Sequence, residues 1–277
     1  MTTRQEAVRN IEIHIAYDGS YFHGWAHQPG RQTVQESIRL VAERFFKTKG
    51  LVVEGCSRTD SGVHALDQFA SIYLPSSAAP IPEYAIPMAL NQRLPRGVLC
   101  LGAKEVPINH FTRFEVSGKC YTYLFMKNVS RNPFLKNYAC YPKKSIDWEL
   151  FMEASKYFIG EKYFQNFTVK DTSRPPLKSS IREVYSINFT DHGTVVAITI
   201  KGNRFLYKMV RRIMGYLMKV GMGEFPIEET PKYFEPGDYY GIIPTADAGG
   251  LYLEKMFFDM EDLHAYKHQI FPILQLP

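Results

Sequence analysis

LVVEGCSRTDSGVHALDQFASIYL, residues 51–74, places two apolar runs on either side of a polar loop. The runs Leu51–Gly55 and Gln68–Leu74 have the length and the content of β-branched and aromatic residues that are typical of strands. The loop contains Gly62, and glycine can adopt backbone angles that other residues avoid. This stretch therefore predicts two strands that hold a sharply turning polar loop.

The segments on both sides of this strand pair predict a mixture of strands and helices. Upstream, Asn10–Tyr17 alternates apolar and polar residues at period two, as a strand does, and Gln32–Lys49 has apolar residues at helical spacing. Downstream, we expect a helix from Pro82 and a strand at Val98–Val106. The predicted order of the first half is β-α-β-β-α-β.

The second half of the sequence repeats this order. The expected elements are strands at Lys119–Met126, Ile181–Phe189, Val195–Lys201 and Leu251–Phe258, and helices at Asp147–Ile159 and Phe205–Val220. We predict an α+β fold of two pseudo-symmetric βαββαβ halves of the RRM or ferredoxin-like type, whose antiparallel sheets join around a central cleft. The predicted domains are residues 1–107, which carry the polar loop, and residues 108–277, which complete the cleft.

The composition excludes several classes of protein. The chain has 277 residues, of which 45% are hydrophobic, so it can bury a core and is not a disordered chain. Its net charge of +5 would favour a polyanionic partner if the excess lies on one face. The four cysteines are scattered, the polar amino terminus is unlike a targeting segment, and no apolar run is long enough to cross a bilayer. We therefore expect a cytoplasmic protein without membrane segments.

The polar loop is the best candidate for a reactive site. Arg58, Asp60 and His64 lie there among small residues, between two strands. Reacting groups often lie on loops that rigid strands hold. A simple surface turn, in which Asp60 bonds to its own backbone, is the alternative, because Asp-x-Gly is a common turn composition. The residues alone leave both interpretations open.

The loop resembles the Gly-Arg-Thr-Asp-x-Gly-Val-His-Ala signature of TruA-like tRNA pseudouridine synthases, with Ser57 in place of the glycine before the arginine. In the segment YFQNF, Gln165 stands where that family commonly has threonine. Four further blocks are similar to the family in order and spacing over nearly the whole chain: AYDGSYFHGWAHQPGRQTVQ (16–35), FTRFEVSGKCYTYLF (111–125), GNRFLYKMVRRIMG (202–215) and GGLYLEKMFF (249–258). The resemblance implies an isomerase that converts selected uridines of tRNA to pseudouridine.

The resemblance also implies which residues carry the reaction. Asp60 matches the catalytic carboxylate, which either adds covalently to the sugar or base or stabilises charge while a glycal-type intermediate forms. Arg211 matches the arginine that pairs with this carboxylate and opposes the rise in its pKa on burial. Tyr121 matches the family tyrosine, and only the resemblance separates it from Tyr123 on the same strand face. A solvated helix arginine and core tyrosines are the alternatives.

Basic residues are expected to bind the RNA. Arg58 could stack on bases or hold a phosphate while a uridine is extruded from its stem. His64 is expected to fix the loop by hydrogen bonding. A basic track for the RNA backbone is predicted from Lys201, Arg204, Lys208 and Arg212, with Arg211 and Lys219 beside them. A salt-bridged helix face is the alternative for the outer members.

The remaining expectations concern partners and rival functions. The resemblance implies no organic cofactor, no catalytic metal and a homodimer that acts on tRNA, and the compact length favours the anticodon stem-loop as the target. One rival is a non-catalytic RNA-binding module, which would leave Asp60 unexplained and which lacks the RRM pattern of aromatics. The other is a metal-dependent hydrolase using Asp18, Asp60 and His64, for which the sequence has no recognisable ligand motif.

Overall fold

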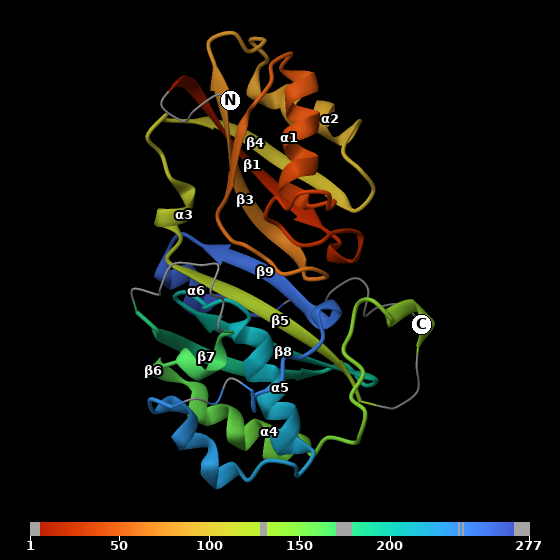
Figure 1. The fold of residues 1–277 in the computed structure, drawn as a ribbon, viewed down its shortest axis with the longest axis vertical. Helices are drawn as coiled ribbons and strands as arrows, with labels where there is room; N and C mark the ends of the chain where they lie inside the picture. Colours follow the sequence, from red (N-terminus) through yellow and green to blue (C-terminus); the bar gives the residue numbers. More distant parts are fainter. Residues whose placement is uncertain (1–5, 128–131, 170–178, 238, 240, 269–277) are drawn as a thin grey trace. The chain divides into compact units, whose positions relative to one another are not determined.

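The chain divides into two compact units, each with its own strands and helices. A computed structural model describes residues 6–127, 132–169, 179–237, 239 and 241–268 (Figure 1). Unit 1 consists of Met1–Val116 and Tyr252–Phe258, and unit 2 of Ser117–Leu251 and Asp259–Pro277. The predicted α+β class is confirmed. The proposed domain division at residues 107 and 108 stays a prediction.

Unit 1 is built on a mixed sheet. The strands β4, β1 and β3 are antiparallel neighbours in that order, and β2 pairs with the distal part of β3. The first residues of β3 pair with β9 in parallel, which differs from the antiparallel sheets that we expected. Parallel pairing needs a long connection, and almost the whole of unit 2 lies between these two strands in the sequence. The strands are β1 (Ala7–Tyr17), β2 (Val52–Gly55), β3 (His64–Pro75), β4 (Val98–Val106) and β9 (Leu251–Phe257).

Two helices, α1 (Val34–Phe45) and α2 (Ile86–Asn91), lie next to each other on one side of these strands (Figure 1). Helix α1 begins after Thr33, whose side chain accepts a hydrogen bond from the Glu36 N–H at 3.4 Å, as an N-cap residue does. Its apolar positions face the core, as the helical spacing predicted. Helix α2 begins at Ile86 instead of Pro82, because a 3-10 turn at Glu83–Ala85 precedes it.

The polar side chains of β1 are more buried than period-two alternation suggests. Glu12 is only 3% exposed, because the segment that includes α3 (Thr112–Glu115) covers it. Its carboxylate lies 2.9 Å from Lys104 Nζ and 3.2 Å from His110 Nε2, and it accepts a hydrogen bond from the Thr112 hydroxyl. Burial acts to raise the pKa of Glu12, but these partners outweigh it and hold the pKa below its usual value.

The buried Glu12 should make the stability of the protein fall in acid. A carboxyl whose pKa is lowered by folding contributes stability that is present above the unfolded pKa, near 4.5, and is lost as the pH falls through the folded value. We expect Glu12→Gln to lower the free energy of unfolding by about 1.5–3 kcal/mol at pH 7, as for hydrogen bonds to a charged group, and by less at pH 3.5. Urea unfolding at both pH values measures this.

The control for this test is Glu105→Gln. Glu105 pairs with Arg9 at 2.7 Å, but its side chain is 42% exposed, and exposed ion pairs contribute about 0–1 kcal/mol. Equal losses at pH 7 and pH 3.5 for Glu12→Gln would contradict the role given to its charge.

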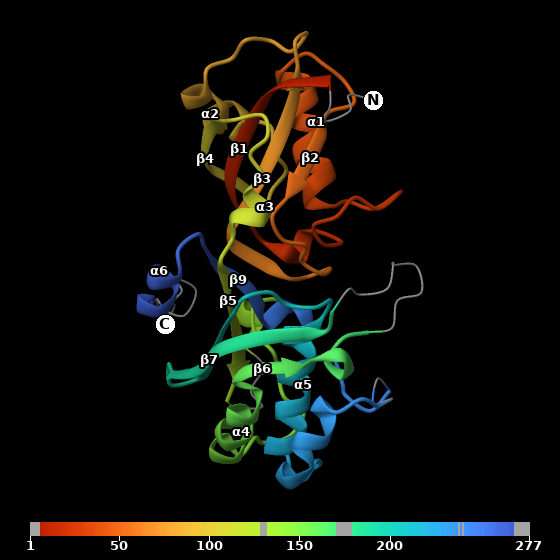
Figure 2. The same cartoon turned by 90° about the vertical axis from the view of Figure 1, so that its left-hand side faces the viewer.

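The strands of unit 2 are antiparallel neighbours in the order β5-β8-β7-β6. Figure 2 shows β7 and β6 side by side. Its strands are β5 (Gly118–Met126), β6 (Gly160–Tyr163), β7 (Ile181–Asp191) and β8 (Val195–Gly202), and its helices are α4 (Trp148–Ser155), α5 (Met209–Gly221) and α6 (Met260–Ala265). The expected elements are present, and the short β6 was not predicted. Among the described residues, no helix is long and apolar enough to span a membrane.

The two faces of the unit 2 sheet differ in chemistry. Phe125 on β5 packs edge-on against Phe151 of α4 at 6.0 Å, so its face forms the apolar core. On the opposite face, the hydroxyls of Thr122 and Thr199 lie 3.3 Å apart, and Lys201 follows two residues along β8. Residues that face each other across antiparallel strands share a face, so a polar row runs along this second side.

Candidate active site

The polar loop is anchored at its base by Gln68 of β3. The Ser57 N–H donates to Gln68 Oε1 at 3.1 Å, and Gln68 Nε2 donates to the Ser57 carbonyl at 2.9 Å. Both residues are buried, so the bonds replace the strand pairing that ends where the loop begins. Ser57, which departs from the family signature, therefore occupies an inward position of the loop.

The middle of the loop is held by the segment after β1. The Thr59 hydroxyl lies 2.8 Å from the Tyr17 hydroxyl in the interior, and the Thr59 carbonyl accepts a hydrogen bond from the Trp25 N–H at 3.1 Å. The family block at residues 16–35 was recognised in the sequence, but nothing in the pattern predicted these contacts. They tie the residue before Asp60 to two separate points of unit 1.

We expect the hydroxyl pair of Tyr17 and Thr59 to couple in stability measurements. Thr59→Val keeps the shape but removes one hydroxyl in a buried place, which should cost about 1–3 kcal/mol of the free energy of unfolding. The double variant with Tyr17→Phe should cost less than the sum of the single variants, by about 0.5–3 kcal/mol for residues in contact. Urea unfolding of the four proteins measures the coupling, and additive losses would show that the hydroxyls do not interact.

Glycines allow close approaches around the loop. Gly62 has a φ of +81°, the left-handed region that the sequence suggested for it. Gly19 has no room for a side chain, because a Cβ there would lie 2.2 Å from the Val63 carbonyl oxygen. The backbone that follows Asp60 is thus packed directly against the segment after β1.

His64 fixes the end of the loop, as predicted. Its side chain is only 3% exposed, and Nδ1 accepts a hydrogen bond from the Gly19 N–H at 3.0 Å. The ring also stacks on Tyr252 of β9, with ring centres 4.6 Å apart. These contacts place His64 in the supporting structure of the loop.

Burial alternates from residue to residue along the loop. Ser57 and Thr59 are buried, whereas Arg58 is exposed and Asp60 is half-buried. The cation and the carboxylate that the sequence singled out are therefore less buried than their neighbours Ser57 and Thr59.

In unit 2, the two candidate tyrosines of β5 have different environments. Tyr123 is fully buried, and its hydroxyl donates a hydrogen bond to the Asp247 carbonyl. Burial, followed by the neighbouring Cys140 thiol, raises the pKa of Tyr123 well above its usual value. Tyr121 is 7% exposed and packs edge-on against Phe205 at 5.2 Å. Tyr123 therefore has a structural position, which the period-two pattern could not reveal.

The two adjacent arginines of α5 have different environments. Arg211 is half-buried, and its Nε donates to the Ala246 carbonyl at 2.9 Å, while the Ala246 N–H donates to the Arg211 carbonyl at 3.0 Å. Arg212 is only 4% exposed and donates to the Asn166 carbonyl at 3.2 Å. The sequence placed both near RNA, but Arg212 serves the interior of unit 2.

The other predicted RNA-binding residues also differ in how far they are exposed. Lys201 is buried, and its ammonium group donates to the carbonyls of Leu263 and Tyr266 at 2.7 and 2.6 Å. Arg204 is exposed, and Lys208, just before α5, is half-buried with a φ of +59°. Few residues other than glycine adopt this left-handed conformation, and it often marks a functional segment.

Within residues 6–127, 132–169, 179–237, 239 and 241–268, no group of three or more His, Cys, Asp or Glu side chains is arranged to hold a metal ion. Asp18 and His64 do lie close together, at 3.2 Å between Oδ1 and Nδ1, but Asp18 also accepts the Ser20 N–H at 2.9 Å.

The chain is similar to known proteins over most of its length. A family model described as tRNA pseudouridine synthase matches residues 154–259. The tRNA pseudouridine synthase A of Caldicellulosiruptor bescii is 36% identical over 246 residues, which cover 89% of this chain and 98% of that protein. The tRNA pseudouridine synthase A 2 of Bacillus cereus is 33% identical over 252 residues, which cover 91% of this chain and 100% of that protein.

A solved structure gives a weaker likeness. A chain of the archaeal box H/ACA sRNP Nop10–Cbf5 complex is 12% identical to this chain at a TM-score of 0.33, with 75% of this chain and 44% of that chain covered. This similarity is too low to support a conclusion about fold or function. The curated relatives are decisive, because their identity and coverage extend over nearly the whole sequence. The chain therefore belongs to the TruA family of tRNA pseudouridine synthases, which are isomerases, and the resemblance of its motifs is confirmed.

Proposed function

We propose that this protein converts selected uridines of tRNA to pseudouridine with Asp60 as the catalytic carboxylate. The observation that carries the proposal is the loop in which Thr59 is held from both its hydroxyl and its carbonyl, between an exposed Arg58 and a half-buried Asp60. A reacting group needs such a fixed backbone, because an error of about 1 Å in its position can cost 10²-fold in rate.

The reaction gives the carboxylate a defined task. The bond from uracil N1 to the ribose must break, and after the base turns, C5 must bond to the sugar carbon. An ionised Asp60 can add to the sugar or the base, or stabilise positive charge at the sugar. Arg58 is exposed two residues away, where a planar guanidinium can stack on a base or hold a phosphate.

Two residues of unit 2 complete the proposed set of catalytic residues. We assign Tyr121 to the substrate, supported by the structural role of Tyr123, whose hydroxyl is already bonded to a carbonyl. We assign Arg211 as the cation that acts with the carboxylate, supported by the bond from its Nε to the Ala246 carbonyl, which holds the side chain in place. Both assignments come from the family motifs.

The RNA track in the proposal is narrower than the sequence suggested. We keep Arg58, Arg204 and Lys208, which are exposed or half-buried. We leave out Lys201 and Arg212, whose side chains bond to backbone carbonyls in the interior. Contacts from exposed cations to phosphates should make the affinity for tRNA fall steeply with salt.

The wider organisation is also proposed from the family. We infer that the two units are pseudo-symmetric copies, because the first strand of each pairs antiparallel with the second strand of a hairpin: β1 with β3, and β5 with β8. Their arrangement around a central cleft stays a prediction. We further propose a cytoplasmic homodimer without a cofactor that acts on the anticodon stem-loop.

The proposal is tested by mapping pseudouridine at single nucleotides in unmodified tRNA, with EDTA present throughout. Modification of defined uridines, and in particular of the anticodon arm, is the expected result. Binding of tRNA without modification of any uridine would favour the non-catalytic module, and activity that EDTA removes would favour the metal-dependent alternative.

A further inference from the structure

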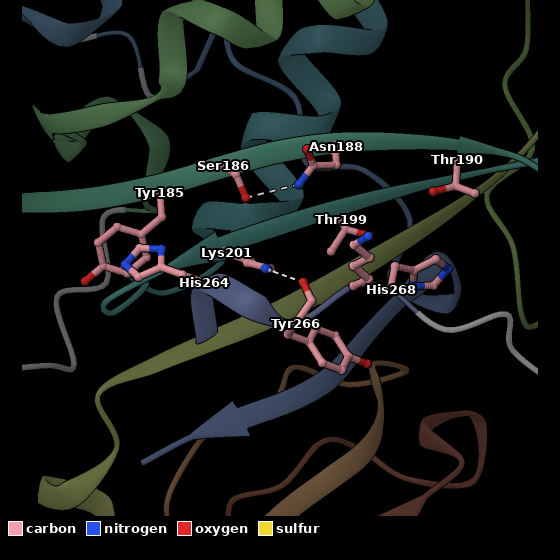
Figure 3. Close-up of a pocket in the computed structure, with 10 residues that line it drawn as sticks. Tyr185, Ser186, Asn188, Thr190, Thr199, Lys201, His264, Tyr266 and His268 are labelled. Atoms are coloured by element: carbon pink, nitrogen blue, oxygen red, sulfur yellow. Dashed lines mark hydrogen bonds between the residues drawn. The ribbon is translucent and has the colours of Figure 1, made fainter. Parts of the chain in front are cut away.

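Unit 2 contains a pocket of about 460 Å³ on the polar face of its sheet (Figure 3). One wall is formed by side chains of β7 and β8. The other is formed by the last turn of α6 and the three residues after it. The volume lies within the range of about 300–1,000 Å³ that is typical of small-molecule sites. The established family activity assigns no role to this pocket.

Most of the strand wall consists of neutral hydrogen-bonding groups. Asn188 and Ser186 of β7 lie opposite Thr199 and Lys201 of β8, so their side chains share one face. Asn188 Nδ2 donates to Ser186 Oγ at 3.1 Å, a bond that Figure 3 marks. An amide and hydroxyls can each donate and accept, which suits the edge of a nucleobase or a sugar.

The second wall is fixed to the sheet by Lys201. Its buried ammonium group donates to the carbonyls of Leu263 and Tyr266, and it lies 5.7 Å from the centre of the Tyr266 ring. Figure 3 shows this lysine reaching from the strand to the tyrosine. The pocket is therefore a built feature whose two walls are joined by a buried cation.

The aromatic rings and the positive charge of the pocket lining favour the binding of an aromatic anion. Tyr185 and His264 form an edge-to-face pair at 5.6 Å, and Figure 3 shows them at one end of the pocket, with His268 at the other. Lys267 adds an exposed ammonium group. Among the described lining residues none is an aspartate or a glutamate, so no carboxylate of the lining opposes an anion.

We propose that this pocket binds a nucleoside monophosphate unit. The base stacks on the rings, as bases do on aromatic side chains, and the strand hydroxyls and amide bond to its polar edge or to the sugar. Lys267 and the hydroxyl groups receive the phosphate. The same unit exists as a free nucleotide and as one nucleotide of an RNA strand, and the proposal does not depend on Asp60 or on catalysis.

Calorimetric titration of the full chain tests the proposal. The probes are uridine 5′-monophosphate, adenosine 5′-monophosphate, uridine, inorganic phosphate and a single-stranded oligouridylate. Lys267→Glu and Asn188→Ala alter two exposed side chains of the pocket. Lys143→Glu makes the same charge change at an exposed residue outside the lining, and Arg58→Ala alters the proposed active site in unit 1.

We expect a monophosphate to bind one site per chain, at least tenfold more tightly than uridine or phosphate alone. Lys267→Glu and Asn188→Ala should each weaken it at least tenfold, and Lys143→Glu and Arg58→Ala should not. Tighter binding of the oligouridylate, with the same sensitivity to the pocket variants, would identify RNA as the source, and weaker binding would identify a free nucleotide.

Several results would overturn the proposal. They are the absence of binding by every probe, an affinity for inorganic phosphate equal to that for the nucleotides, and binding that only Arg58→Ala weakens. The thermal unfolding midpoint of each variant shows that it is folded. Because the readout is binding in unit 2, a failure leaves the catalytic proposal for Asp60 unaffected.

Discussion

Asp60→Asn is expected to reduce the formation of pseudouridine in tRNA by at least about 10³-fold, within the range for loss of a reacting acid or base group. Asparagine has nearly the same shape, so the loop and its bonds through Thr59 should remain. What is lost is the negative charge, and with it the ability to add to carbon or to stabilise a positive sugar. The measurement is the initial rate of pseudouridine formation, together with the affinity for tRNA.

The matched control is Asp147→Asn. Asp147 is an exposed carboxylate that caps α4 by accepting the Leu150 N–H at 3.0 Å, and asparagine caps a helix about as well. The control should retain full activity. An Asp60→Asn protein that binds tRNA and still works at a rate near that of the control would remove Asp60 from the catalytic role.

Gly19→Ala is expected to reduce activity by about 10²-fold without touching any reacting group, because a shift of about 1 Å in a catalytic site has effects of this size. The new Cβ would lie 2.2 Å from the Val63 oxygen and 2.4 Å from the Val63 carbonyl carbon. These are backbone atoms, which cannot rotate away as the end of a side chain can. The loop between Asp60 and His64 would have to move.

Gly102→Ala is the control for this substitution. Gly102 lies on β4 of the same unit, and a Cβ there meets no atom within 4 Å. We expect it to be as active as the unaltered protein. Comparison of kcat and of the thermal midpoint for the two variants separates a displaced loop from a general loss of stability, and equal kcat values would show that the contact with Val63 is unimportant.

Much of the fold could be predicted because the strand and helix patterns are local. The limits of the strand Val98–Val106 were predicted as observed, and the strand pair around the loop is present. The parallel pairing of β9 with β3 was missed, since it joins residues that are almost two hundred positions apart and leaves no periodic signal. The four-residue β6 was missed because so short a segment shows no clear alternation.

The candidate site was predictable to the extent that it depends on residue type in a motif. Arg58 and Asp60 were singled out in this way, and the structure leaves Arg58 exposed and Asp60 half-buried, while their roles stay predictions. Burial was harder to predict. Lys201 belongs to a basic cluster in the sequence, yet its ammonium group donates hydrogen bonds to backbone carbonyls. A sequence shows the lysine but not which carbonyls will lie near it in the fold.

The return of β9 to unit 1 has a consequence for synthesis on the ribosome. Tyr252 supplies the ring on which His64 stacks, and the Met256 N–H donates at 2.7 Å to Asp67 on β3, so the strand that carries the loop is completed by a strand from much later in the sequence. The first 116 residues can form helices and most of their sheet as they emerge. The nascent loop nevertheless lacks its last support until residues 252–256 have been translated.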